Sequence, residues 1–231
     1  MTFFNKAKSL PLIYLLGISN LLFISCKDKV EETTPDLPVI ESTTPSQVVM
    51  MQAFYWDVPA GGTWWDNLNS KLDSWQSAGI TTIWLPPISK GQSGELSMGY
   101  DPYDYFDFGQ YNQYGTVETR FGSETELTSL LTNAKAKGLK LIADIILNHN
   151  SGGFSEYNPY KGENTWTAFS PASGKFNRTY EDFHPNALHT ADAGYFGGFA
   201  DLCHEVQNVQ DWLWNREDGV GKYYKNTLGF S

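Results

Sequence analysis

Apolar and polar residues follow regular spacings in five stretches of the first two-thirds of the chain. Residues 47–55 predict a strand, residues 63–79 have apolar positions at helical spacing, and residues 81–85 predict a second strand. Residues 123–138 predict a second helix, and it leads into an apolar run at 139–147. Both helical stretches begin with a Ser or Thr three residues ahead of an acid, which is the pattern of a capping box. This alternation predicts an α/β fold with a parallel sheet and right-handed crossovers.

The apolar run at 139–147 carries a single acid, Asp144, and ends on Asn148, His149 and Asn150. A near-continuous apolar run between glycines is typical of a strand buried on both faces of a parallel sheet. A buried carboxylate is costly unless it is paired or hydrogen-bonded. Parallel α/β folds place their chemistry at the carboxyl ends of strands, so we expect a functional site around this polar triplet.

Three other stretches do not follow this alternation of strands and helices. Residues 88–122 form a long aperiodic segment after the second strand, and such loops are usually functional. Residues 150–205 are rich in Gly, Asn, Ser and aromatics, which predicts a small inserted domain. Residues 206–231 return to a helix-like pattern, with an interruption near Gly219 and Gly221.

The N-terminus has the features of an export signal. Residues 1–25 combine two lysines with an apolar stretch too short for an ordinary membrane span, and end in a sequence resembling a bacterial lipoprotein processing site before Cys26. We therefore expect Cys26 to be lipidated, with the protein held on a membrane in the bacterial cell envelope. A plain secretory signal is the alternative. Residues 26–46 are charged and Thr/Pro-rich, which predicts a flexible tether. A lipidated Cys26 leaves Cys203, the second of two cysteines, without a disulfide partner.

Charge and aromatic content narrow the class of partner. A formal net charge of -10 argues against nucleic acid and against an anionic membrane surface as the main partner. The chain has 8 Trp, 13 Tyr and 14 Phe, many of them beside Gly, Ser and Asp. Aromatic faces next to polar groups suit sugar rings, although an aromatic-rich core would give the same counts.

Six ordered motifs resemble the α-amylase family, glycoside hydrolase family 13, and among its members the archaeal and plant-like α-amylases. The motifs are QAFYWDVP at 52–59, IWLPP at 83–87, SMGYDPYD at 97–104, GTVETRFGS at 115–123, ADIILNH at 143–149 and ADLCHE at 200–205. The resemblance implies a (β/α)8 TIM barrel, of which the chain holds the first three strands and helices. It assigns residues 47–149 to the barrel, 150–205 to a domain B inserted after the third strand, and 206–231 to the third helix and the approach to the fourth strand.

The resemblance also implies endo-acting hydrolysis of internal α-1,4 bonds in starch-like α-glucans with retention, which uses a carboxylate nucleophile and a second carboxyl group as acid/base. In the family these groups follow later strands, so we expect them beyond Ser231. The chain would then be a fragment with no hydrolase activity of its own. One alternative is a non-catalytic glucan-binding lipoprotein on the cell surface, and another is a transglycosidase on the same fold.

Site residues follow from the same resemblance. Tyr100 matches the tyrosine that stacks on the sugar ring, and His149 matches the histidine that hydrogen-bonds it. Asp144 matches an acid that supports the active site from beneath. The family's calcium site corresponds to the positions Asn148, Asp192, Asp201 and the carbonyl of Gly194. Hard oxygen ligands from two substructures would suit Ca²⁺.

A second metal is implied by three softer ligands in the same stretch, His184, His189 and Cys203. Thiolate and imidazole suit zinc rather than calcium. The archaeal relatives place zinc at the matching positions, which would give the lone Cys203 a role. The fourth zinc ligand is left open, as water or a further side chain.

Overall fold

The computed structural model describes residues 47–192 and 194–231. The expected signal segment, the tether and Cys26 lie outside the described residues. A three-stranded sheet occupies one part of the unit that begins at Pro45, with strand order β1-β2-β5. All pairings in it are parallel, with Met50 opposite Thr82 and Thr82 opposite Lys140. The predicted parallel α/β arrangement is therefore confirmed. The strands span β1 Met50–Gln52, β2 Thr82–Leu85 and β5 Lys140–Ala143.

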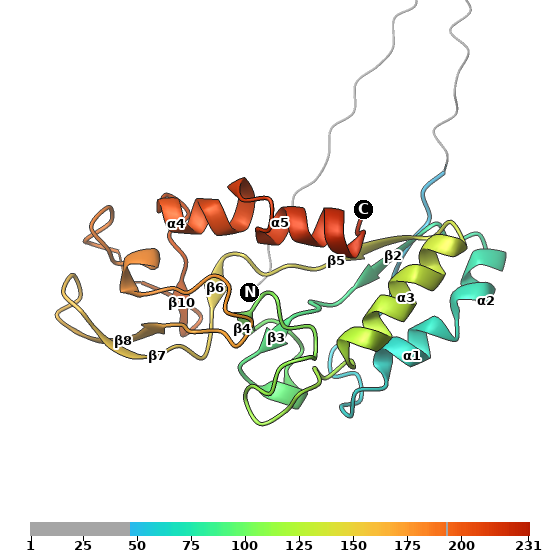
Figure 1. Cartoon of the computed structure of the whole chain (residues 1–231), viewed down its shortest axis with the longest axis horizontal. Coiled ribbons are helices and arrows are strands. Elements are labelled where there is room, and N and C mark those ends of the chain that lie inside the picture. Colours follow the sequence, from blue (N-terminus) through green and yellow to red (C-terminus); the bar gives the residue numbers. More distant parts are fainter. Residues whose placement is uncertain (1–46, 193) are drawn as a thin grey trace, which may run out of the picture. The chain divides into compact units, whose positions relative to one another are not determined.

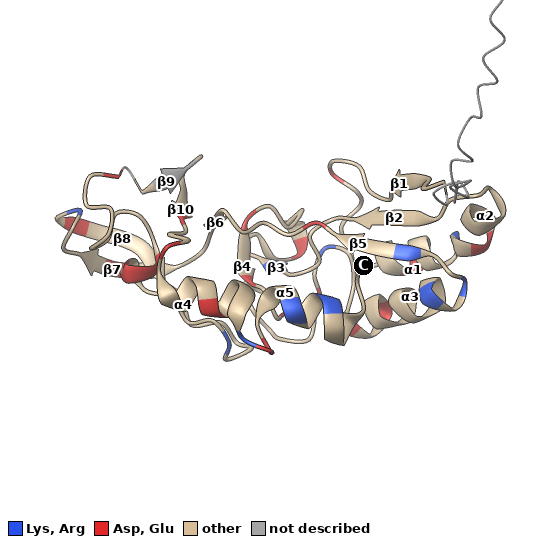
Figure 2. Cartoon of the chain, turned by 90° about the horizontal axis from the view of Figure 1, so that it is seen from above, with Lys and Arg blue, Asp and Glu red and all other residues tan. Residues whose placement is uncertain are grey.

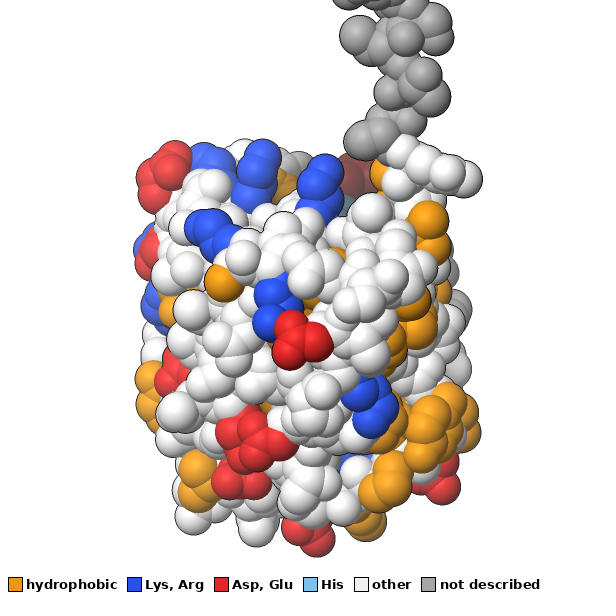
Figure 3. Space-filling model, turned by 90° about the vertical axis from the view of Figure 1, so that its right-hand side faces the viewer, with side chains coloured by type: hydrophobic (Ala, Val, Ile, Leu, Met, Phe, Trp, Pro, Cys, Tyr) orange, Lys and Arg blue, Asp and Glu red, His pale blue; other side chains and the backbone are white. Residues whose placement is uncertain are grey.

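Helices α1, α2 and α3 lie together on one side of this sheet (Figures 1 and 2). Their bounds are α1 Trp64–Asn69, α2 Leu72–Ser77 and α3 Glu124–Ala136. Trp65, Leu68 and Leu130 are almost completely buried between α1, α3 and the strands. Hydrophobic side chains also gather along one side of the surface shown in Figure 3, while charged side chains are spread over the rest of that view.

The two capping-box predictions have different outcomes. Ser123 accepts a hydrogen bond from the amide of Glu126 and the Glu126 carboxylate accepts from the amide of Ser123, so this box is confirmed. Thr63 makes no such contact, and the predicted single helix is split into α1 and α2. At the helix start the amide of Trp65 donates to the distant carbonyl of Phe121. Between α1 and α2 the amide of Lys71 donates to the carbonyl of Leu68, a 3₁₀-type bond that interrupts the α-helical pattern.

The apolar run at 139–147 is a shorter strand than predicted. Only residues 140–143 are β-structure, and residues 142–147 are half-buried rather than buried on both faces. Leu139 and Leu141 are buried, and Leu141 is paired with Ile83 of β2. Helices α1–α3 lie on one side of the sheet (Figure 2), and residues 142–147 keep part of their accessible surface.

Short strands and loops form the segment between β2 and α3. Strands β3 Lys90–Gly91 and β4 Pro102–Asp104 pair antiparallel, and a 3₁₀ turn, η1 Gly94–Leu96, lies between them. The amide of Ser151 donates to the carbonyl of Pro102, so this segment contacts the residues that follow β5.

Residues 149–201 build two small antiparallel units. One is the hairpin of β7 Phe154–Asn158 and β8 Glu163–Ala168. The other has the order β6-β10-β9, with Asp201 of β10 opposite His149 of β6. Its strands and the intervening 3₁₀ turn are β6 His149–Asn150, β9 Tyr195–Phe196, β10 Phe199–Asp201 and η2 Tyr180–Asp182.

The chain then runs through four short helical pieces with a break before Val220, as the glycines near that point predict. The pieces are α4 Gln207–Gln210, η3 Asp211–Asn215, α5 Val220–Lys222 and η4 Tyr223–Leu228, of which η3 and η4 are π-helical. The hydroxyl of Tyr224 donates to the carbonyl of Tyr105, and the amide of Ser231 donates to the carbonyl of Leu141. None of the helices within 47–192 and 194–231 has the length and apolarity needed to cross a bilayer.

Candidate functional site

Three of the predicted site residues meet where β5 leaves the sheet. The Tyr100 hydroxyl donates a hydrogen bond of 2.9 Å to Oδ2 of Asp144. Nε2 of His149 lies 3.0 Å from the carbonyl oxygen of Tyr100. Burial and the contact with Asp144 raise the pKa of Tyr100, so its hydroxyl stays protonated and remains the donor. The structure therefore brings Tyr100, Asp144 and His149 into one connected group.

Two aromatic side chains flank this group. The Trp56 ring stacks near Tyr100, with ring centroids 5.9 Å apart and an interplanar angle of 29°, and it is 74% exposed. The Phe199 ring stacks on His149 at 4.9 Å and 11°. Trp56 was not singled out from the sequence, although it lies in the QAFYWDVP motif, and Phe199 directly precedes the ADLCHE motif. Phe199 lies in the stretch 150–205 that the sequence predicts as an insert, and Trp56 lies in the stretch predicted as the first part of the barrel.

A cavity of about 390 Å³ opens beside Tyr100. Trp56, Tyr100 and Phe199 give it aromatic walls, and Asp57, Gln92 and Asp101 are among its polar lining residues. A volume of this order is typical of small-molecule sites. The cavity thus offers ring faces and hydrogen-bonding groups together.

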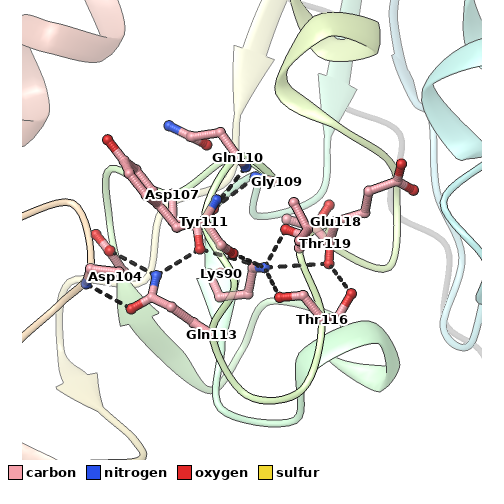
Figure 4. Close-up of polar contacts among 12 residues, drawn as sticks. Lys90, Asp104, Asp107, Gly109, Gln110, Tyr111, Gln113, Thr116, Glu118 and Thr119 are labelled. Atoms are coloured by element: carbon pink, nitrogen blue, oxygen red, sulfur yellow. Dashed lines mark hydrogen bonds and ion pairs between the residues drawn. The ribbon is translucent and has the colours of Figure 1, made fainter.

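A buried ammonium group shapes the loop beside this cavity (Figure 4). Lys90 is completely buried, and its Nζ donates to the carbonyls of Val117 at 2.6 Å and Thr116 at 3.2 Å. Longer contacts reach the carbonyls of Tyr111 and Glu118. Its Nζ also lies 3.4 Å from Oδ2 of buried Asp107. Burial lowers the pKa of Lys90, and the carboxylate of Asp107 acts in the opposite direction.

The loop held by Lys90 makes contacts with the inserted residues. The Tyr114 hydroxyl donates to the carbonyl of Gly152. Gln113 accepts from the amide of Ala172 at 2.8 Å and donates to Oδ2 of Asp107 at 2.7 Å. The Lys90 cluster therefore fixes the barrel-side loop against residues 150–205.

The four predicted calcium ligands are held near one another by backbone contacts. The Asp201 amide donates to the Gly194 carbonyl, and the Gly194 amide donates to Oδ1 of Asp192. The Asn148 carbonyl accepts from the amide of Leu202, next to Asp201. Burial raises the pKa of Asp201, with the Asp192 carboxylate adding to the shift and His184 opposing it. Carboxylate and carbonyl oxygens are the donors that a hard divalent cation takes, and such a cation would lessen the repulsion between Asp192 and Asp201.

The predicted zinc ligands are only partly brought together. The rings of His184 and His189 lie 4.9 Å apart, and Cys203 is buried as a free thiol. Nδ1 of His184 lies 3.5 Å from Asp192, and Nε2 of His189 lies 3.3 Å from Glu205. Across the described parts of the chain, no three His, Cys, Asp or Glu side chains group closely enough to hold a metal ion. The structure does not assemble the three-ligand set, and zinc stays a prediction.

Comparison with known proteins gives a family model for most of the chain. Residues 42–228 match the model described as the α-amylase catalytic domain. A probable α-amylase 2 from Arabidopsis thaliana is 30% identical over 225 residues, which cover 93% of this chain and 45% of the relative. A glucan 1,4-α-maltohexaosidase from Bacillus sp. strain 707 is 41% identical over 103 residues, which cover 45% of this chain and 20% of that protein. The chain thus spans less than half the length of these relatives.

Among solved structures, a maltogenic α-amylase from Thermotoga neapolitana superposes with a TM-score of 0.53 at 15% identity. The superposition covers 80% of this chain and 37% of that structure. At this identity the likeness concerns the fold alone, and it agrees with the predicted part of a (β/α)8 barrel.

Proposed function

Because the chain belongs to the α-amylase catalytic-domain family, we propose that the protein containing it hydrolyses internal α-1,4 bonds of starch-like glucans with retention. The observation that carries the proposal is the connected group of Tyr100, Asp144 and His149 beside an aromatic-walled cavity. Retaining hydrolysis needs two carboxyl groups placed about 5–5.5 Å apart across the scissile bond. The residues described here bind and orient the sugar for that chemistry.

Each member of the group has a separate part in binding. The Tyr100 ring supplies a face on which the C–H side of a glucose ring stacks. His149 is held in one orientation by the Tyr100 carbonyl and the Phe199 ring, so its imidazole is fixed for a sugar hydroxyl. Asp144 accepts from the Tyr100 hydroxyl and thereby fixes the tilt of that ring. A preorganised arrangement of this kind reduces the ordering cost of binding.

We further propose that Ca²⁺ binds at the junction of barrel and insert, held by Asp192, Asp201, Asn148 and the Gly194 carbonyl. The donor chemistry supports this, and so does the environment of Asp201, whose pKa is raised by burial and further by repulsion from the Asp192 carboxylate. The cation would offset that repulsion and fasten β10 to the residues after β5. Since Asp201 is opposite His149 in the β6–β10 pairing, such a clamp would also steady the substrate site.

Export and membrane attachment through a lipidated Cys26 remain part of the proposal. They rest on the sequence of residues 1–26. Metabolic labelling of the natural host protein with a radioactive fatty acid tests this, with a Cys26→Ser variant as control. Label that is present in the natural protein and absent from the variant supports the anchor, and label in neither contradicts it.

The activity is tested on the natural full-length protein that contains this sequence. Maltoheptaose is added and the products are followed by ¹H NMR, which resolves the anomeric configuration of the new reducing end. Release of shorter maltooligosaccharides that first appear as the α-anomer supports retaining hydrolysis. Binding without any cleavage would contradict the enzyme and support the glucan-binding alternative. Cleavage to β-anomers would contradict retention.

A further inference from the structure

We propose that the β7–β8 hairpin carries an outer binding site for long α-glucan chains, with Trp166 as its stacking surface. The proposal rests on the proposed function, because it extends the glucan site around Tyr100 to further glucose units. It concerns which chain lengths the site prefers.

The hairpin presents aromatic side chains on its accessible face. Trp166 is 65% exposed, Phe154 63% and Tyr157 60%. Tyr157 is opposite Asn164, and Trp166 follows two residues later on the same face of β8. Large aromatics gathered on an accessible face are a feature of binding surfaces.

The opposite face of the hairpin explains why these rings face outward. Thr165 and Thr167 are buried, and their hydroxyls lie 2.7 Å apart. The Thr167 hydroxyl also donates to Oε1 of Glu156 at 2.7 Å. Because side chains alternate along a strand, burying this threonine face directs Trp166 toward solvent. The hairpin is thus held by its polar face, and the aromatic face is left for a ligand.

Trp166 also forms one wall of a second cavity, of about 350 Å³. Asn150, Ser151 and Gln92 contribute polar groups to the lining of this cavity. Asn150 is completely buried, and its Nδ2 donates to Tyr105 at 2.9 Å. Its Oδ1 is buried and has no hydrogen-bond partner among residues 47–192 and 194–231.

Glycines fix the shape of the same cavity. A Cβ atom at Gly153 would lie 2.4 Å from the carbonyl oxygen of Trp166, and one at Gly152 would lie 2.6 Å from the Tyr114 hydroxyl. Gly152 also has a positive φ of 91°. These close approaches hold the backbone against the hairpin and against the loop fixed by Lys90. A side chain at either position would therefore disturb this wall of the cavity.

The two cavities share Gln92 and Phe199 as lining residues. A glucan chain that stacks on Tyr100 can therefore pass Phe199 and continue to Trp166. Alternating ring faces and hydrogen-bonding groups along this route match the C–H faces and hydroxyls of successive glucose units. This continuity, together with the polar groups in both cavities, favours a glucan over an apolar protein surface as the occupant.

The test is isothermal titration calorimetry of the full chain with maltoheptaose and with maltotriose. Trp166→Ala should weaken maltoheptaose binding about tenfold, which corresponds to about 1.4 kcal/mol, and change maltotriose binding less than about twofold. Trp166→Phe, which keeps a ring, should retain affinity within about threefold. The matched control is Trp214→Ala, since Trp214 is also half-exposed but lines neither cavity.

The outcomes separate this inference from the proposed function. If the unaltered chain binds neither sugar, the proposed function is contradicted. If the unaltered chain binds both sugars and Trp166→Ala leaves both affinities unchanged, only the outer site is refuted. The outer site is also refuted if Trp166→Ala lowers the affinity for both sugars equally. A second measurement uses no variant: oxidation of tryptophan by N-bromosuccinimide, mapped by peptide mass spectrometry. Maltoheptaose should protect Trp166 and not Trp214, and equal oxidation of Trp166 with and without the sugar would overturn the proposal.

Discussion

Replacing Lys90 by Met should destabilise the fold far more than the same change at a surface lysine. Met keeps most of the aliphatic stem and removes the ammonium group. The buried carboxylate of Asp107 then loses its cation, and the carbonyls of Val117 and Thr116 lose their charged donor. Asp107 keeps hydrogen bonds from the amide of Gly109 and from Gln113, so it stays in place as a buried charge.

The size of the effect follows from this geometry. Removing one partner of a buried ion pair costs about 3–5 kcal/mol, because the other charge is left without compensation. For a unit of this length, 1 kcal/mol shifts the melting temperature by about 2–4 °C, so the variant should melt roughly 6–20 °C lower. Burial lowers the pKa of Lys90, which shows that desolvation opposes the pair. The pair as a whole therefore contributes less than the cost of breaking it.

Thermal and urea unfolding followed by circular dichroism give the two midpoints. The matched control is Lys137→Met, since Lys137 pairs with Asp73, whose side chain is 82% exposed. That change should cost less than about 1 kcal/mol. If Lys90→Met and Lys137→Met shift the midpoints equally, the buried cluster does not hold the loop and the reasoning is refuted.

Three further predictions concern calcium, helix α3 and the sugar platform. Calcium at one hundred times its dissociation constant should stabilise the chain against thermal unfolding by about 2.7 kcal/mol. Replacing the proposed ligand in Asp201→Asn should abolish this gain, and the control Asp218→Asn should preserve it. Ser123→Ala should lower the free energy of unfolding in urea by about 0.5–2 kcal/mol, because the capping box is lost. Ser129→Ala in the same helix should leave the free energy of unfolding unchanged, and equal effects of the two changes would contradict the cap. Tyr100→Ala should weaken maltotriose binding in calorimetry about tenfold and Tyr100→Phe less than about threefold; equal losses would show that the hydroxyl, and not the ring face, carries the affinity.

Local patterns predicted the elements whose partners are close in sequence. The Ser123 cap and α3 follow from contacts within a few residues, and β2 follows from a short apolar run before two prolines. The capping box expected at Thr63 is wrong, and the amide of Trp65 beside it donates to the carbonyl of Phe121, far along the chain. No local spacing carries that information.

Some residues of the candidate site were predicted from the sequence and others were missed. Tyr100, Asp144 and His149 were predicted through motifs, and the structure connects them by hydrogen bonds. Phe199 reaches His149 only because β10 pairs with β6, a long-range contact that the Gly-rich sequence between them does not indicate. The buried role of Lys90 was also missed, since its partners are mostly backbone carbonyls, which leave no trace in residue type.

The distribution of charge bears on the class of partner. In the view of Figure 2, basic residues are scattered over β5, α3 and α5 and are interspersed with acids, rather than forming one basic stripe. A basic stripe is the usual footprint of nucleic-acid binding. The formal charge of -10 likewise argues against nucleic acid as the main partner.

The central claim, that the group around Tyr100 binds α-glucan, is tested most directly by calorimetry of the full chain with maltotriose. The comparison is His149→Ala against His204→Ala, because each imidazole Nε2 contacts a backbone carbonyl, at 3.0 Å and 2.9 Å, and only His149 belongs to the group. We predict that the unaltered chain and His204→Ala bind alike and that His149→Ala binds at least about tenfold more weakly. Equal affinity for all three, or no binding by the unaltered chain, would contradict the claim.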